Sequence, residues 1–190
     1  KHFFLLLLLF LVSCSVAEQE QEVAGYKDIP WNSSFPLIEQ HYPGVRFVEE
    51  DSFHVTLFRL DQQEEGLDRI EFKLFEEQLI SVIHYYVGPI DQLKRDDFVK
   101  HMVSGLGPKI DERQTTSESL AGTTNVVIWE YKDNLILFRS YPPNQEEGFA
   151  KKENSIIFIY KPTFDKMVYY RKHSQGDNDN QVIDYDYIEY

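Results

Sequence analysis

The alternation of strand-like and helical periods along the chain is the feature that most constrains its fold. In "DRIEFKL", Ile70, Phe72 and Leu74 alternate with charged residues, which predicts a strand over residues 68–74. Such alternation is typical of an antiparallel sheet with one face against a core and the other in water. β-branched or aromatic runs between turn-prone segments predict further strands over residues 52–60, 79–87, 125–131, 135–141, 155–161 and 167–171.

Two helices are predicted, each ahead of a run of strands. The first covers residues 34–41, where Ser33 or Ser34 can cap the start. In the second, around residues 98–106, apolar side chains recur at helical spacing, and Gly107-Pro108 ends the helix. The chain therefore reads as a helix followed by three strands, and then the same order again.

This order predicts an α+β fold with an antiparallel sheet made of two helix-then-three-strand units. The first unit covers residues 32–88 and the second covers residues 89–170, which indicates a duplication. Both units lie within one predicted domain, residues 32–173. A single domain without duplication is the alternative. With 42% hydrophobic residues the chain can bury one ordinary core. The element order is similar to that of small envelope lipoproteins and secreted inhibitors of the β-lactamase-inhibitor-like type, a resemblance that implies binding to other proteins.

The N-terminal segment predicts export. Residues 3–12 are ten unbroken apolar residues behind Lys1 and His2. As a helix they would span about 15 Å, half of a bilayer core, which is typical of a signal peptide rather than a spanning helix. Ser15-Val16-Ala17 ends in small residues that an ordinary signal peptidase accepts.

A second cleavage pattern overlaps the first, because Leu11-Val12-Ser13-Cys14 resembles the lipobox of bacterial lipoproteins. The resemblance implies that residues 1–14 are a lipoprotein signal peptide ending in Cys14, whose thiol takes a diacylglycerol and which becomes the acylated first residue. Cys14 is the only cysteine in the 190 residues. Internal disulfides are therefore excluded, whereas secreted eukaryotic domains usually carry them. The alternative is cleavage after Ala17, which would leave a secreted soluble protein. That alternative predicts a glycan on Asn32 of the Asn32-Ser33-Ser34 sequon. We interpret the triplet instead as a helix cap.

Charge limits the partners. The net charge of −13 argues against nucleic acid, which needs a basic surface. A lipid on Cys14 would attach the chain to a membrane without any basic patch, since two acyl chains give lasting anchorage. Residues 15–31 read as a flexible acidic tether.

Residues 174–190 form an acidic, tyrosine-rich tail. We interpret it as a solvated end, although its alternating Asp and Tyr residues would also suit a strand added to a sheet edge. A calcium site is not predicted, because the spacing of an EF-hand loop fails. The carboxylates of the tail are Asp177, Asp179, Asp184, Asp186 and Glu189.

No motif predicts catalysis, a metal or a cofactor. The histidines show no HExxH spacing, and no nucleotide-binding or hydrolase motif occurs. His54 and His84 lie in predicted strands where they could meet across a sheet, but positions on a wet face explain them better. Glu64-Glu65 and Glu76-Glu77 fall in predicted turns, where acids are normally solvated. Trp129, Tyr131 and Tyr141 are plausible ligand contacts, with core packing the favoured interpretation.

The sequence therefore predicts a lipid-anchored α+β domain on the cell envelope that binds or scaffolds a protein partner. Catalytic and metal-binding residues are not predicted, and the ligand-binding residues are not identified. The alternatives are a secreted soluble ligand-binding protein and an enzyme without a recognisable motif.

Overall fold

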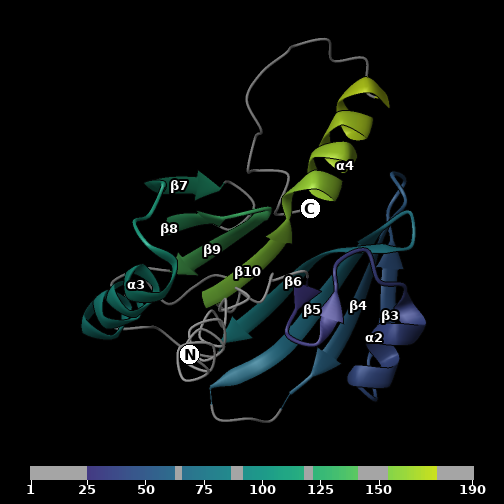
Figure 1. Ribbon diagram of the computed structural model, residues 1–190, viewed down its shortest axis with the longest axis horizontal. Coiled ribbons are helices and arrows are strands. Elements are labelled where there is room, and N and C mark those ends of the chain that lie inside the picture. The colour runs from purple at the N-terminus through teal and green to yellow at the C-terminus, as the bar shows by residue number, and fades with distance from the viewer. Residues whose placement is uncertain (1–24, 63–65, 87–91, 118–121, 141–153, 175–190) are drawn as a thin grey trace, which may run out of the picture.

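A computed structural model describes residues 25–62, 66–86, 92–117, 122–140 and 154–174 (Figure 1). The fold is α+β, built on one large antiparallel sheet. A short hairpin opens the described chain, formed by β1 (Gly25–Tyr26) and β2 (Ile29–Pro30). The first half then contains α2 (Phe35–His41), β3 (Arg46–Glu50), β4 (Val55–Asp61), β5 (Leu67–Phe75) and β6 (Gln78–Tyr86). The second contains α3 (Gln92–Leu106), β7 (Asp111–Ser117), β8 (Gly122–Tyr131), β9 (Asn134–Ser140), β10 (Asn154–Tyr160) and α4 (Lys161–Ser174).

The large sheet has eight strands in the order β3-β4-β5-β6-β10-β9-β8-β7. Each half is a meander, and the two meet where β6 pairs with β10, from Asn154 opposite Tyr86 to Ile159 opposite Ser81. All the ladders are antiparallel. The sheet is therefore continuous across the middle of the molecule (Figure 1).

The predicted number of strands in each half was wrong, because in the described residues four strands follow α2 and four follow α3, instead of three. The additional strands, β3 and β7, are the two edges of the sheet. Their sequences, "RFVEE" and "DERQTTS", are mostly polar and lack the apolar alternation that identified the inner strands. An edge strand pairs on one side only and needs little apolar surface, so its periodicity is weak.

Both faces of the sheet carry apolar clusters. On one face α4 packs Phe164, Met167 and Val168 against strand residues that include Ile83 and Ile157. The other face is covered in two places. α2 and the hairpin lie over the first half, where the Phe35 and Phe58 ring centroids are 4.1 Å apart. α3 lies over the second half, where those of Phe98 and Phe138 are 4.5 Å apart.

The strand predicted at residues 167–171 is wrong, because this segment lies inside α4. Its buried residues recur at helical spacing once the preceding turn is included: Thr163, Phe164, Met167, Val168 and Arg171. The window 167–171 taken alone shows too little of that period to distinguish it from a strand.

Residues 25–31 are part of the folded structure, so the range 15–31 is not a tether throughout. Tyr26, Ile29 and Trp31 are all buried, at 5%, 1% and 8% exposure. These three apolar side chains pack into the cluster beneath α2. The acidic composition of residues 18–22 had obscured this second, apolar part of the segment.

The Asn32-Ser33-Ser34 triplet is a turn and not a side-chain cap. Ser34 occupies the N-cap position of α2, but its hydroxyl makes no capping hydrogen bond. The Ser33 hydroxyl donates to the carbonyl oxygen of Pro30 at 2.6 Å. Asn32, with φ +63°, accepts a hydrogen bond from Thr163 of α4 at 2.6 Å. The triplet therefore links the hairpin to α2 and α4.

The other predicted strands are confirmed, with ends that differ from the prediction by up to three residues. The strands expected over 52–60, 68–74, 79–87, 125–131, 135–141 and 155–161 correspond to β4, β5, β6, β8, β9 and β10. α3 ends at Leu106, where Gly107 has φ +86° and its N–H bonds to the carbonyl oxygen of Val103. Glu76 and Glu77 form the exposed turn between β5 and β6, as expected for solvated acids.

Several predictions concern positions outside the described residues. They include the signal peptide with Cys14, Glu64-Glu65, Tyr141 and the tail beyond Ser174. Within the described part of the chain, no helix is both long enough and apolar enough to cross a membrane.

Candidate functional site: an aromatic pocket between the hairpin and the sheet

A pocket of about 560 Å³ lies between the β1–β2 hairpin, the centre of the sheet and the end of α3. The hairpin side is lined by Gly25, Tyr26, Lys27 and Trp31, and α3 contributes Gly105 and Leu106. The sheet side is lined by His84, Tyr86, Tyr131, Asn134, Ile136, Ile156 and Phe158. The wall is thus mainly aromatic and aliphatic and spans both halves of the fold.

The hairpin that closes the pocket depends on a glycine. A Cβ atom placed on Gly25 would lie 2.0 Å from the carbonyl oxygen of Ile29, which is far closer than any real contact. Gly25 pairs with Pro30, and Tyr26 pairs with Ile29 across the two-residue turn. The absence of a side chain at residue 25 therefore lets the two short strands approach each other.

Trp31 fixes the hairpin to the second half of the molecule. Its indole N–H donates to the side-chain oxygen of Asn134 at 2.6 Å. Its ring stacks on Tyr160, with the centroids 5.8 Å apart and an angle of 10° between the planes. Asn134 is the first residue of β9 and is itself buried. One side chain thus joins the start of the fold to β9 and β10.

His84 is the polar centre of the pocket wall. Its Nε2 atom is hydrogen-bonded to the hydroxyl of Tyr26, and its Nδ1 atom lies 3.4 Å from the hydroxyl of Tyr86. The ring also contacts Phe158 edge-on, at 5.8 Å between centroids. Both imidazole nitrogens are therefore engaged by phenols, which fixes the orientation of the ring.

Burial, with Lys27 nearby, lowers the pKa of His84 to about 4. Burial also raises the pKa of Tyr26 and that of Tyr86 above the usual range for a phenol. At neutral pH the three side chains are consequently uncharged. Lys27, exposed at the hairpin turn with its Nζ 5.4 Å from the Tyr26 ring centroid, is the charged residue of the lining.

This arrangement suits binding better than acid–base chemistry. Efficient general acid–base catalysis needs a pKa near the operating pH, and a histidine with a pKa of about 4 is a weak base at pH 7. A largely apolar pocket with a few oriented, neutral polar groups is instead typical of a ligand site. Such polar groups orient a bound molecule, and the aromatic walls supply most of the contact area.

The structure separates the two histidines, and the predicted position on a wet sheet face is wrong for His84, which lines the pocket. His54 lies in the turn before β4, with φ +61°, 3.6 Å from Glu50. His84 lies in β6 inside the pocket. Among the described residues no group of three or more His, Cys, Asp or Glu side chains is placed to hold a metal ion.

The predicted aromatic contacts divide between core and pocket. Trp129 is fully buried in the cluster beneath α3. Tyr131 lines the pocket. Sequence reasoning missed Tyr26 and Trp31, because both were assigned to a tether. The local signal for this hairpin is weak, because Lys27-Asp28 separates apolar residues but is not one of the dipeptides typical of two-residue hairpin turns.

Comparison with known proteins identifies no family. No protein-family model and no curated protein matches the chain. A solved structure of a cysteine-rich secretory protein from Staphylococcus aureus aligns at 9% identity and a TM-score of 0.38. The alignment covers 70% of this chain and 44% of that protein, so the chain spans less than half of its length.

Proposed function

We propose that this chain is an exported binding module, anchored to the cell envelope through a lipid on Cys14, which recognises an apolar group of a protein partner. The observation that carries the proposal is the pocket of about 560 Å³. Its size lies within the range of about 300–1,000 Å³ that is common for ligand sites. The group that fits the chemistry of the pocket is an aromatic or branched aliphatic side chain of the partner. The neutral polar groups of the pocket near His84 are available to hydrogen-bond to it. No catalytic step is assigned to it.

The position of the pocket supports an anchored role. Gly25 lines the pocket and is eleven residues beyond Cys14. Eleven extended residues span at most about 40 Å. A lipid on Cys14 would therefore hold the pocket near the membrane surface, where a partner in the envelope is available. Secretion without lipid, after cleavage behind Ala17, is the competing location.

The repeated element order supports a duplication within the domain. A helix followed by a four-strand meander occurs twice, and the halves meet at β6 and β10. The predicted boundaries at 32–88 and 89–170 need extension by α4, whose last residue is Ser174. The order of elements is also what supports the resemblance to protein-binding domains of the β-lactamase-inhibitor-like type.

Filling the pocket is expected to abolish binding. Leu106→Trp places a larger ring at the α3 side of the pocket, so we expect at least a tenfold loss of affinity for N-phenyl-1-naphthylamine, a neutral apolar fluorophore. Titration of fluorescence enhancement measures it. Val103→Trp is the matched control, because Val103 is on the same helix but 40% exposed and outside the pocket lining. Equal binding by both variants, or no saturable binding by the unaltered chain, would contradict the proposed site.

The anchor is tested separately. In a bacterial host, Cys14→Ala is expected to move the protein from the detergent-soluble membrane fraction to the aqueous fraction. The N-terminal peptide of the unaltered protein should begin at an acylated Cys14, which mass spectrometry identifies. Ser13→Ala is the control, because it keeps a small residue before the cysteine. A mature start at Glu18 without lipid would overturn the anchor and leave the pocket proposal standing.

A further inference from the structure

The charge in the described lining of the pocket is a cation. Lys27 lies in the two-residue turn between β1 and β2, where its φ is +52°. The other described lining residues include no Asp, Glu, Lys or Arg, and His84 is uncharged at neutral pH because its pKa is lowered to about 4. A ligand in this pocket therefore meets a positive charge at the hairpin and no carboxylate from the described wall.

Lys27 is available to a ligand. Its side chain is exposed and makes no hydrogen bond or ion pair with any of the described residues. Its Nζ atom lies 5.4 Å from the centroid of the Tyr26 ring, which is part of the pocket wall. A cation–π contact at an exposed site is weak and leaves the positive charge in place. The ammonium group is thus held beside the wall without a described carboxylate against it.

The charge of Lys27 acts inside the pocket. Burial is the larger cause of the lowered pKa of His84, and the positive charge of Lys27 is the second. The carboxylate of the next residue, Asp28, acts elsewhere: burial and, to a smaller extent, Asp28 raise the pKa of Tyr42, which is not among the lining residues. Because Coulomb interactions weaken with distance, Lys27 is the turn residue whose charge affects the polar centre of the pocket.

A hydroxyl beside His84 can also donate to a ligand. The Tyr86 hydroxyl lies 3.4 Å from Nδ1 of His84, which is long for a hydrogen bond, so the hydroxyl can turn toward a bound acceptor. The indole N–H of Trp31, by contrast, is committed to Asn134 at 2.6 Å. The polar groups that the described wall offers to a ligand are therefore a cation and a hydroxyl donor, which suit an acceptor oxygen.

We propose that the pocket binds an apolar group that carries a negative charge: the C-terminal aromatic or branched aliphatic residue of a protein partner, with its free carboxylate at Lys27. This inference rests on the proposed binding function of the pocket and adds a charge preference to it. In a C-terminal residue the apolar side chain and a carboxylate belong to the same residue. Because Lys27 is exposed, the rest of the partner chain can leave the pocket into solvent.

The net charge of −13 does not prevent an anion from binding here. At 0.15 M salt, exposed charges more than about 8 Å apart are largely screened. The charges nearest to the ligand therefore decide its affinity. An ion pair between exposed groups increases an affinity by up to about fivefold, and this increase should fall as salt is added.

Two dyes that differ by one charge test this preference in the full chain. The dye 8-anilinonaphthalene-1-sulfonate is N-phenyl-1-naphthylamine with an added sulfonate. Fluorescence titration should show that Lys27→Gln weakens binding of the anionic dye about fourfold and changes binding of the neutral dye by less than about twofold. Lys27→Arg keeps the positive charge and should bind both dyes like the unaltered chain.

Lys132→Gln is the matched control. Lys132 is also exposed in a hairpin turn with a positive φ, +54°, and its Nζ atom lies 5.6 Å from the centroid of the Tyr131 ring. It is not among the lining residues of the pocket. Lys132→Gln removes the same charge from the chain as Lys27→Gln, so it should leave the affinities for both dyes unchanged.

Peptides test the source of the anion. An acetylated tripeptide that ends in phenylalanine should displace the neutral dye at about a quarter of the concentration that its C-terminal amide requires. Equal displacement by the acid and the amide would overturn the assignment to a C-terminal carboxylate. Displacement by 3-phenylpropionate without displacement by the peptide acid would also overturn it, because the ligand would then be a small free acid.

The dye titrations separate failure of this inference from failure of the proposed function. If the neutral dye binds saturably but Lys27→Gln and Lys132→Gln have equal effects on the anionic dye, the charge preference is wrong and the binding function stands. If the unaltered chain shows no saturable binding of the neutral dye, the proposed function is wrong and this inference fails with it.

Discussion

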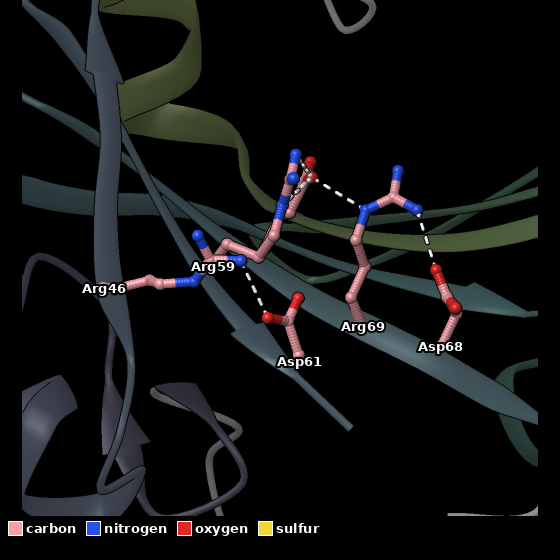
Figure 2. A network of polar contacts seen from close by, with 6 residues as sticks. Arg46, Arg59, Asp61, Asp68 and Arg69 are labelled. Carbon is pink, nitrogen blue, oxygen red and sulfur yellow. Dashed lines mark hydrogen bonds and ion pairs between the residues drawn. The ribbon is translucent and has the colours of Figure 1, made fainter. Parts of the chain in front are cut away.

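Replacing Glu71 by glutamine is expected to lower the free energy of unfolding by about 3 kcal/mol. One oxygen of the buried Glu71 carboxylate accepts three hydrogen bonds from Arg59 and Arg69 (Figure 2). Glutamine keeps the shape of the side chain and an oxygen acceptor, but it removes the negative charge that strengthens these bonds. Two guanidinium groups would then be held close together in a partly buried place. Urea unfolding followed by circular dichroism measures the change.

Arg46→Gln is the matched control in the same part of the sheet. Arg46 and Asp61 pair at 2.7 Å, but their side chains are 60% and 63% exposed. An exposed ion pair of this kind is worth about 0–1 kcal/mol. If Glu71→Gln destabilises the fold no more than Arg46→Gln, the charge of the buried carboxylate does not stabilise this part of the sheet.

Replacing Trp31 by alanine is expected to cost about 3–5 kcal/mol of stability, the usual range for removing a large buried aromatic side chain. The substitution removes the stacking on Tyr160 and leaves the side-chain oxygen of Asn134 without its indole donor. Because Trp31 also lines the pocket, binding of N-phenyl-1-naphthylamine should weaken as well. Thermal unfolding and fluorescence titration of the same sample give both quantities.

Tyr169→Ala supplies the comparison for Trp31. Tyr169 is an aromatic residue on α4 with 64% of its surface exposed. Its removal should change stability by less than about 1 kcal/mol and leave binding unaltered. If the Trp31→Ala protein unfolds like the unaltered chain, the hairpin does not stabilise the fold. The hairpin would then not be an ordered wall of the pocket.

The inner strands were predictable because their side chains alternate strongly. "DRIEFKL" and "LILFRSY" have apolar residues that a sheet must bury, and the turn at Lys132-Asp133 leaves little choice of connection. The edge strands β3 and β7 were not predictable in the same way, since their residues contact water and carry no apolar period. The start of α4 was not predictable for a similar reason, because the helical spacing of its apolar residues is complete only over two turns.

The pocket could not be predicted, because it is assembled from residues far apart in the chain. Tyr26 and His84 are separated by 58 positions, and Trp31 and Asn134 by 103. No short sequence motif indicates such long-range contacts. Lys27-Asp28 is not a typical hairpin turn dipeptide, and only the tertiary structure places the hairpin over β6, β9 and β10.

The single junction between β6 and β10 has a consequence for how the chain folds. Every other ladder of the large sheet joins strands that follow one another in sequence, so each meander can form from local contacts. Asn154 must find Tyr86 across 68 positions, and this is a long closure with a correspondingly larger loss of chain entropy. Non-local pairings of this kind slow folding. The two meanders are therefore expected to form early and to join late, with the pocket completed only in that last step because its wall draws on both.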